Sequence, residues 1–239
     1  FEHAISVTGK KYPDLALTHN NLGIALEDKG RFSEAITHYR TAMKIKPDFA
    51  LPHNNLGNIM YSMREIDRAI TYYRSALKLS PDYAMAHNNL GIALEEKGEL
   101  EEAIAHYRLA IKFKPNFFLA HKNLGNTLLA MRETKEAISH YKTAIKFKPD
   151  YADAHYNLGN AFLGTRRTKE AILHFKIAIK LKPDDVGAHY NLGLALAQKG
   201  DLREAINHYR ETVRLRPDLV SARKNLEMAL LRLEEYEHK

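Results

Sequence analysis

The sequence predicts an all-α protein, built as a solenoid of antiparallel helix pairs, because several residue types recur in register at every 34th position. The clearest column is histidine, and it consists of His19, His53, His87, His121, His155 and His189. Glycine from Gly23 and alanine from Ala35 keep the same step, and so does proline from Pro13 to Pro217. Between these markers, the apolar residues follow helical spacing. Residues 16–219 are therefore predicted to form six stacked repeats.

The six predicted repeats occupy residues 16–49, 50–83, 84–117, 118–151, 152–185 and 186–219. Residues 1–15 are predicted to be part of a preceding helix or repeat, and we expect the chain to continue upstream because it begins at Phe1. Residues 220–239 start like another first helix, with Asn225 in register, but Glu227 takes the place of the glycine. The polar end of this segment predicts a solvent-facing capping helix and a natural C-terminus, as terminal repeats require.

The third repeat shows how each repeat divides into two helices. Residues 84–97 form one helical apolar stripe, and Gly98 can adopt the left-handed conformation that ends a helix. Residues 100–114 form a second stripe, which Pro115 stops. Asn116 is predicted to cap the next first helix. Aspartate holds this capping position elsewhere, as Asp14, Asp48, Asp82, Asp150, Asp184 and Asp218.

Small residues predict how closely the paired helices pack, and turn residues predict which repeats open most readily. Gly91 and Ala103 lack bulk, so the paired helices of the third repeat are expected to approach closely. Glycine closes three of the turns within repeats, whereas arginine stands there in the others, as Arg64, Arg132 and Arg166. A left-handed residue other than glycine costs on the order of 1 kcal/mol. Because Thr134 and Thr168 also replace an apolar residue after the turn, we expect the fourth and fifth repeats to open most readily.

The composition removes several classes of function. The chain has no cysteine, which excludes disulfides, thiolate metal sites and cysteine nucleophiles. No segment approaches the ~18 uninterrupted apolar residues that a membrane span needs. We find no phosphate-binding glycine loop, nucleophile elbow or separate carboxylate pair. We therefore expect a protein that is not an enzyme and needs no cofactor, and the lack of cysteine fits a cytoplasmic location.

The net charge of +7 permits an anionic partner but does not by itself indicate one. Nearly half of the 36 lysines and arginines fall in columns on the second helices, beginning at Arg40, Lys44 and Lys46. We interpret these columns as a solvated outer face, with an anion-binding ridge as the alternative. Because aromatic residues are not interleaved with the basic columns, no nucleic acid is expected as a partner.

A second histidine column consists of His38, His106, His140, His174 and His208. A metal site needs ligands that converge on one point. The repeat copies each histidine, and no HExxH pair occurs. We therefore interpret both columns as packing residues at helix contacts and predict no metal site.

The motif A-x-x-H-N-N-L-G-x-x-L, followed by A-x-x-x-Y-x-x-A and a proline, resembles the tetratricopeptide repeat. The resemblance covers residues 16–219, with histidine in place of the family's leading tryptophan and Leu, Met or Phe in place of its first tyrosine. It implies a right-handed superhelical solenoid whose first helices line the inner surface. It also implies a protein that binds other proteins.

One asparagine column is a candidate binding site, and it consists of Asn21, Asn55, Asn89, Asn123, Asn157, Asn191 and Asn225. We call this column the asparagine ladder. A carboxamide has both a donor and an acceptor, so the ladder could pair with the main chain of an extended peptide. The ladder resembles that in the repeat region of protein O-linked N-acetylglucosamine transferases. The alternative is that each asparagine bonds to neighbouring helices and only maintains the stacking.

Neighbouring residues on the same helical face are predicted to tune peptide specificity, namely Asn20, Asn54, Asn58, Asn88, Lys122, Asn126, Tyr156, Asn160 and Tyr190. Lys122, Asn126 and Asn157 match the first part of the carboxylate clamp of chaperone-binding arrays. However, Gly187 and Asn191 stand where that clamp has basic residues. A working clamp is therefore not expected.

Three functions are compatible with these residues. The first is a scaffold that binds a protein or peptide segment in a concave groove. The second is the substrate-recruiting region of a larger enzyme, which the resemblance suggests would be of the glycosyltransferase type. The third is a self-assembling array that stacks end to end through its N-terminal face.

Overall fold

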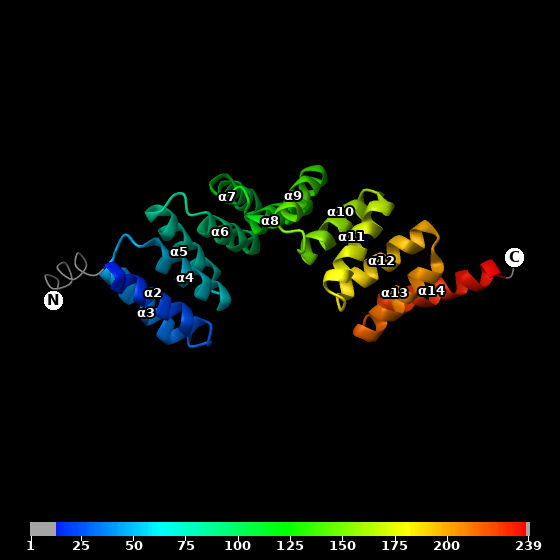
Figure 1. Ribbon diagram of the computed structural model, residues 1–239, viewed down its shortest axis with the longest axis horizontal. Coiled ribbons are helices and arrows are strands. Elements are labelled where there is room, and N and C mark those ends of the chain that lie inside the picture. The colour runs from blue at the N-terminus through cyan, green and yellow to red at the C-terminus, as the bar shows by residue number, and fades with distance from the viewer. Residues whose placement is uncertain (1–12, 238–239) are drawn as a thin grey trace. The chain divides into compact units, whose positions relative to one another are not determined.

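The computed structural model describes residues 13–237, and these residues form helices joined by short turns, without any strand (Figure 1). The helices are α2 (Pro13–Glu27), α3 (Phe32–Ile45), α4 (Ala50–Ser62), α5 (Ile66–Leu79), α6 (Ala84–Lys97), α7 (Leu100–Phe113), α8 (Phe118–Ala130), α9 (Thr134–Phe147), α10 (Ala152–Gly164), α11 (Thr168–Leu181), α12 (Val186–Lys199), α13 (Leu202–Leu215) and α14 (Val220–Glu237). The helix predicted within residues 1–12 lies outside the described residues.

The chain divides into two compact bodies, which we describe separately: the N-terminal body, Phe1–Ala120, and the C-terminal body, His121–Lys239. In the N-terminal body, α2 packs against α3, α4 against α5, and α6 against α7. In the C-terminal body, α10 packs against α11 and α12 against α13, and α14 packs on α13. Successive pairs also contact each other, through α3–α4, α5–α6 and α11–α12. This consecutive packing confirms the predicted all-α solenoid.

The predicted cap residues are wrong at all four first helices whose N-cap is defined, α4, α6, α10 and α12. The N-cap residues of α4, α6 and α10 are Phe49, Tyr83 and Tyr151, and none has a side-chain cap. Among these four helices, only α12 has a side-chain cap, and it comes from Asp185 rather than the predicted Asp184: the Asp185 carboxylate accepts a hydrogen bond from the Ala188 amide at 2.9 Å. The predicted column lies one residue earlier because Pro-Asp forms the centre of a turn. In the turn before α4, the Phe49 amide donates to the Lys46 carbonyl at 3.1 Å.

The turns within the repeats adopt the predicted left-handed backbone. Gly98 and Gly200 have φ angles of 86° and 95°. The three turn arginines also have positive φ angles, 63° at Arg64, 66° at Arg132 and 59° at Arg166. Non-glycine residues rarely adopt this conformation, so these three turns are locally strained.

The core of each repeat forms around a glycine and an aromatic ring. Tyr107 of α7 is fully buried, and its Cε1 atom lies 2.6 Å from the position that a Cβ on Gly91 of α6 would take. The same contact joins Gly159 to Phe175, and the Ala103 side chain is also fully buried. The absent side chain of glycine thus makes room for a ring, which refines the sequence-based expectation of close helix approach.

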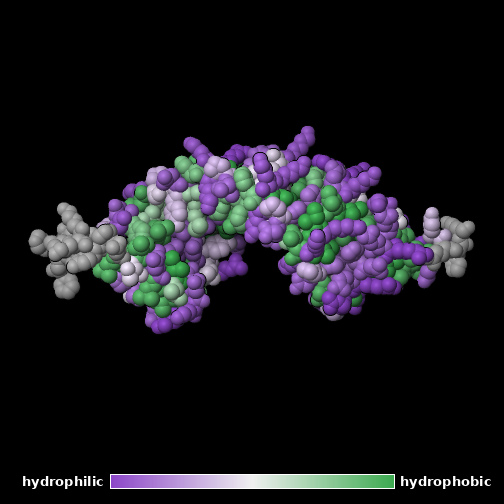
Figure 2. Space-filling model, in the orientation of Figure 1, coloured by the Kyte–Doolittle hydropathy of each residue, from purple (hydrophilic) through white to green (hydrophobic). Residues whose placement is uncertain are grey.

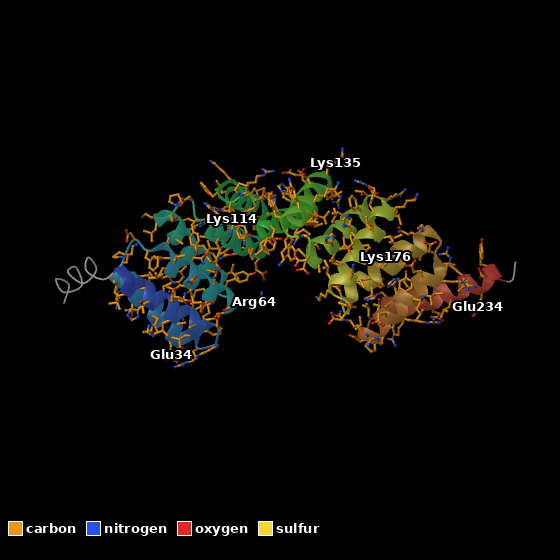
Figure 3. All side chains as sticks on the ribbon, in the orientation of Figure 1. Glu34, Arg64, Lys114, Lys135, Lys176 and Glu234 are labelled. Atoms are coloured by element: carbon orange, nitrogen blue, oxygen red, sulfur yellow. The ribbon has the colours of Figure 1, made fainter. Side chains whose placement is uncertain are left out.

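Ion pairs on the second helices support the interpretation of a solvated outer face. Arg74 of α5 pairs with Glu102 of α7 at 2.8 Å, and Lys176 of α11 pairs with Glu204 of α13 at 2.7 Å. Two of the side chains labelled in Figure 3, Lys135 and Glu234, project clearly from the ribbon. Hydrophilic residues predominate on the visible surface, with smaller hydrophobic areas among them (Figure 2). Among the described residues, no helix has the length and apolar character of a transmembrane span.

Candidate functional site

The asparagine ladder forms a hydrogen-bonded row along the first helices of each body. In the N-terminal body, the Asn55 side-chain amide donates to Asn20 of the preceding repeat at 3.0 Å. The Asn89 amide donates to Asn54 at 3.1 Å and to Asn58 at 3.0 Å. Each ladder amide thus reaches back to the first helix of the repeat before it.

The C-terminal body keeps this pattern but changes the acceptors. The Asn157 amide donates to Asn126 at 2.9 Å, and the Asn191 amide donates to Asn160 at 2.7 Å. Tyrosine hydroxyls act as further acceptors. Tyr156 accepts from Asn191 at 3.3 Å, and Tyr190 accepts from Asn225 at 3.0 Å. At least one N–H of each of these ladder amides is therefore engaged within the stack, as the stacking alternative of the sequence analysis expects.

Burial separates the predicted site residues into two groups. Asn20 and Asn54 are 1% exposed and Asn88 is 4% exposed, so these three side chains position the ladder from within the helix packing. Asn123 is also buried, at 7%, whereas Asn21 of α2 is exposed. The other members of the predicted site are half-buried, namely Asn55, Asn58, Asn89, Lys122, Asn126, Tyr156, Asn157, Asn160, Tyr190, Asn191 and Asn225. Only exposed or half-buried side chains can meet a ligand directly.

The acceptor half of the ladder differs between the two bodies. In the N-terminal body, the Asn55 and Asn89 oxygens accept from Asn54 and Asn88, both at 3.3 Å. In the C-terminal body, the side-chain oxygens of Asn157, Asn191 and Asn225 accept no hydrogen bond from any described residue. The free hydrogen-bonding capacity of the ladder in the C-terminal body thus includes oriented acceptors in α10, α12 and α14, together with one further N–H on Asn157 and one on Asn225.

Tyrosine side chains of the second helices donate hydrogen bonds to residues of the first helices. The Tyr39 hydroxyl donates to Glu27 at 2.6 Å, and burial raises the pKa of the Glu27 carboxyl. The Tyr141 hydroxyl donates to Asn126 at 2.9 Å. Asn126 therefore accepts from both the ladder and the second helix of its own repeat, which restrains its orientation.

The two histidine columns pair with each other, which the sequence interpretation missed. In five repeats, the Nδ1 atoms of the two imidazoles lie 2.9–3.0 Å apart. The signal in the sequence was the constant separation of 19 residues between partners, as in His87 and His106. The second repeat lacks the pair because Tyr72 replaces the partner of His53, whose Nδ1 atom is buried without a hydrogen bond.

The proton arrangement of a histidine pair follows from its third contact. The His87 Nε2 atom lies 3.0 Å from the Pro81 carbonyl oxygen. Because a carbonyl can only accept, Nε2 carries the proton, and the His87 Nδ1 atom accepts from His106. Burial lowers the pKa of both imidazoles, and for His106 the facing His87 lowers it further. Within residues 13–237, no three His, Cys, Asp or Glu side chains group together to hold a metal ion.

Comparisons with known proteins agree with this architecture. A tetratricopeptide repeat family matches residues 54–116 and 160–220, and a family described as TPR repeat matches residues 28–64 and 133–165. No curated protein matches the chain.

Several solved structures are similar to this chain. Pseudomonas aeruginosa pilF is 19% identical with a TM-score of 0.82, over 90% of this chain and 97% of that chain. YrrB, described as a TPR protein with an unusual peptide-binding site, is 23% identical with a TM-score of 0.65, over 77% of this chain and 95% of that chain. MamA is 26% identical with a TM-score of 0.62, over 66% of this chain and 93% of that chain. Together with the repeated helix pairs, the family matches show that the chain belongs to the tetratricopeptide repeat family.

Proposed function

We propose that this chain is a non-catalytic protein-interaction scaffold that binds an extended peptide segment along its first helices through the asparagine ladder. The observation that carries the proposal is the row of three oriented carboxamide oxygens on Asn157, Asn191 and Asn225. Main-chain N–H groups of an extended peptide are the natural donors for such acceptors. The tetratricopeptide repeat is generally a protein-interaction module without catalytic activity, and the chain shares that fold.

The internal hydrogen bonds of the ladder favour binding because they pre-organise it. Each donated bond holds its carboxamide in one orientation, so little side-chain freedom is lost when a peptide arrives. The same bonds use one N–H of Asn157 and one of Asn225 and both of Asn191, so a peptide meets the three side-chain oxygens and the two remaining N–H groups. Tyr156 and Tyr190 accept hydrogen bonds from the ladder, which leaves each hydroxyl hydrogen available to a peptide carbonyl. The proposed site thus offers a peptide main chain both acceptors and donors.

Two resemblances support a peptide as the ligand. The ladder is similar to that in the repeats of O-linked N-acetylglucosamine transferases. YrrB has the same fold and is described as having a peptide-binding site. A recruiting region within a larger enzyme would use the same face, so that alternative differs in what is attached to the chain rather than in the binding chemistry.

A double substitution tests the proposal. Short peptides are selected from a display library against the whole chain, and their dissociation constants are measured for the wild type and for Asn157→Ala with Asn191→Ala. We expect a loss of roughly ten-fold or more, since two main-chain hydrogen bonds disappear. Asn207→Ala is the matched control, because Asn207 is an exposed asparagine on α13, outside the ladder. A lower melting temperature with unchanged affinity would show that the ladder serves only the stacking.

A second candidate, end-to-end self-association, has support from α2. Its Leu17 and Leu22 side chains are each 44% exposed, and Leu15 and Ile24 are each 40% exposed. Residues seven apart share a face of a helix, so Leu15 lies with Leu22 and Leu17 lies with Ile24 on two different faces of α2. Exposed apolar side chains of this kind favour contact with a second copy. Light scattering over a range of concentrations tests this, with Leu17→Lys and Leu22→Lys as the variant. A constant mass in the wild type would exclude self-association.

A further inference from the structure

The tyrosine of the second helix donates its hydroxyl to the first helix of its own repeat in four of the six repeats. In the first and third repeats, Glu27 and Glu95 accept from Tyr39 and Tyr107, at 2.6 Å and 2.8 Å. In the second and fourth repeats, an asparagine three residues earlier takes this role. Asn58 accepts from Tyr73 at 3.0 Å, and Asn126 accepts from Tyr141 at 2.9 Å.

The last two repeats depart from this rule in different ways. The fifth repeat has Phe175, which has no hydroxyl to satisfy. The sixth repeat keeps a tyrosine, Tyr209, but has Ala197 where the glutamate would stand and Leu194 where the asparagine would stand. Tyr209 is therefore the one member of this column whose hydroxyl has no acceptor among residues 13–237.

The unsatisfied hydroxyl belongs to a side chain that is almost completely buried. Tyr209 is 2% exposed, and burial raises its pKa to about 12, so the hydroxyl keeps its proton at neutral pH. The only polar side-chain atom in the described chain that is both sealed and unpartnered is His53 Nδ1. The Tyr209 hydroxyl is thus not sealed, and it has an opening to the outside. An acceptor on a ligand can therefore reach this donor, which no described residue of the chain satisfies.

The opening is a pocket of about 290 Å³ whose wall includes Tyr209. Leu163, Leu194 and Met228 form an apolar lining, and Arg232 stands beside them on α14. Arg232 is exposed and has no ion pair with any described residue. The ladder residue Asn225 also lines the pocket, so the pocket continues the proposed peptide-binding face at α10, α12 and α14.

We infer that this pocket is a subsite for a carboxylate-bearing side chain of the bound peptide, most simply a glutamate, whose oxygen accepts from the Tyr209 hydroxyl. The inference rests on the proposed function. It specifies the chemical group of the peptide that the C-terminal body of this chain would bind. The methylene groups of such a side chain pack against Leu194 and Met228, and the carboxylate charge faces Arg232. The peptide thereby supplies the hydroxyl acceptor that Glu27 and Glu95 supply within their own repeats.

The repeats themselves suggest the variants for a test. Ala197→Glu introduces an internal acceptor for the Tyr209 hydroxyl, at the position that corresponds to Glu27 and Glu95. Tyr209→Phe removes the hydroxyl, as in the fifth repeat. Both substitutions have a structural precedent in this chain, so both are expected to fold, and Ala197→Glu is expected to melt no lower than the wild type. Tyr107→Phe serves as the matched control, because it removes a hydroxyl that already donates to Glu95.

The probe is the set of short peptides selected from a display library against the wild-type chain. We expect the selected peptides to share an acidic residue. We also expect Ala197→Glu and Tyr209→Phe to weaken them by roughly ten-fold or more, with Tyr107→Phe unchanged. Arg232→Gln should weaken an acidic peptide more than its glutamine counterpart, and it tests the inference at an exposed position even if a core variant were unstable.

The outcomes separate this inference from the proposed function. Selected peptides without a shared acidic residue, or peptides that bind Ala197→Glu, Tyr209→Phe and Arg232→Gln like the wild type, would overturn the subsite. If those peptides are still lost from Asn157→Ala with Asn191→Ala, the scaffold function stands without the subsite. If no peptide can be selected, both proposals fail.

Discussion

Each repeat places a glycine of its first helix against an aromatic ring of its second helix, and this contact is decided at the scale of single atoms. The Tyr107 ring is completely buried and cannot swing aside without disturbing its neighbours. Glycine at Gly91 is therefore required by space, since the φ angle there is that of an ordinary helix. The free energy that glycine costs within a helix is offset by the ring that it admits.

The Gly91→Ala variant is expected to destabilise the chain by about 1–3 kcal/mol, because the new methyl group would lie 2.6 Å from a ring carbon of Tyr107. Gly164→Ala is the control, since a Cβ at this end of α10 would meet no atom within 4 Å. There alanine should leave stability unchanged or raise it slightly. Urea unfolding followed by circular dichroism measures both variants. Equal stability of Gly91→Ala and the wild type would contradict this account of the core.

The turn between the paired helices is the element in which the repeats differ most. Glycine adopts the left-handed conformation freely, whereas Arg64, Arg132 and Arg166 adopt it against their intrinsic preference. The sequence already showed which turns carry arginine, and the structure confirms their backbone conformation. Easier opening of the fourth and fifth repeats, which contain two of these turns, stays a prediction that hydrogen exchange can test.

Replacing a turn arginine with glycine should relieve this strain. We expect Arg132→Gly to stabilise the chain by on the order of 1 kcal/mol, because its φ angle of 66° costs a glycine nothing. Gly98→Arg makes the reverse change at a φ angle of 86° and should destabilise by a similar amount. Thermal unfolding of the two variants provides the comparison. Lower stability of Arg132→Gly would mean that the arginine side chain contributes more than its backbone costs.

At the scale of the whole molecule, the repeated sequence allows the fold to be predicted, but it does not allow the binding site to be predicted in the same detail. The 34-residue period identifies every helix pair, since each column recurs with the same packing role. Hydrogen-bond direction has no such signal, so the sequence could not decide between a ligand and the neighbouring helix as the acceptor for Asn89 and Asn191. The capping error at Asp48 and Asp82 has a similar origin, because a proline turn and a helix cap use the same residue types.

Repetition also adds up small effects, and the histidine pairs are an example. Burial lowers the pKa of His87, His106 and His155, and it lowers that of His174 to about 4. These groups stay neutral in the folded chain, while unfolded histidines take up protons below about pH 6.5. The contribution of these histidines to the free energy of unfolding is therefore fully present above that pH, and it is lost as the pH falls toward the folded-state pKa values.

We expect the melting temperature to fall progressively between about pH 7 and about pH 5. Among the groups that face His106, Glu102 moderates the loss because its carboxylate favours the charged imidazole, whereas Arg74 and His87 oppose that charge. His106→Asn with His174→Asn should flatten the pH dependence, and calorimetry at several pH values measures it. A melting temperature independent of pH over this range would show that the paired histidines do not titrate as described.

The most direct test of the account observes the ladder itself during binding. Heteronuclear NMR resolves the side-chain carboxamide groups, and a selected peptide is titrated into the labelled chain. We expect the signals of Asn157, Asn191 and Asn225 to shift in proportion to occupancy, because their oxygens accept the peptide's N–H groups, while the signal of Asn207 stays in place. Saturating binding that leaves the three ladder signals unmoved would contradict a peptide held by the asparagine ladder.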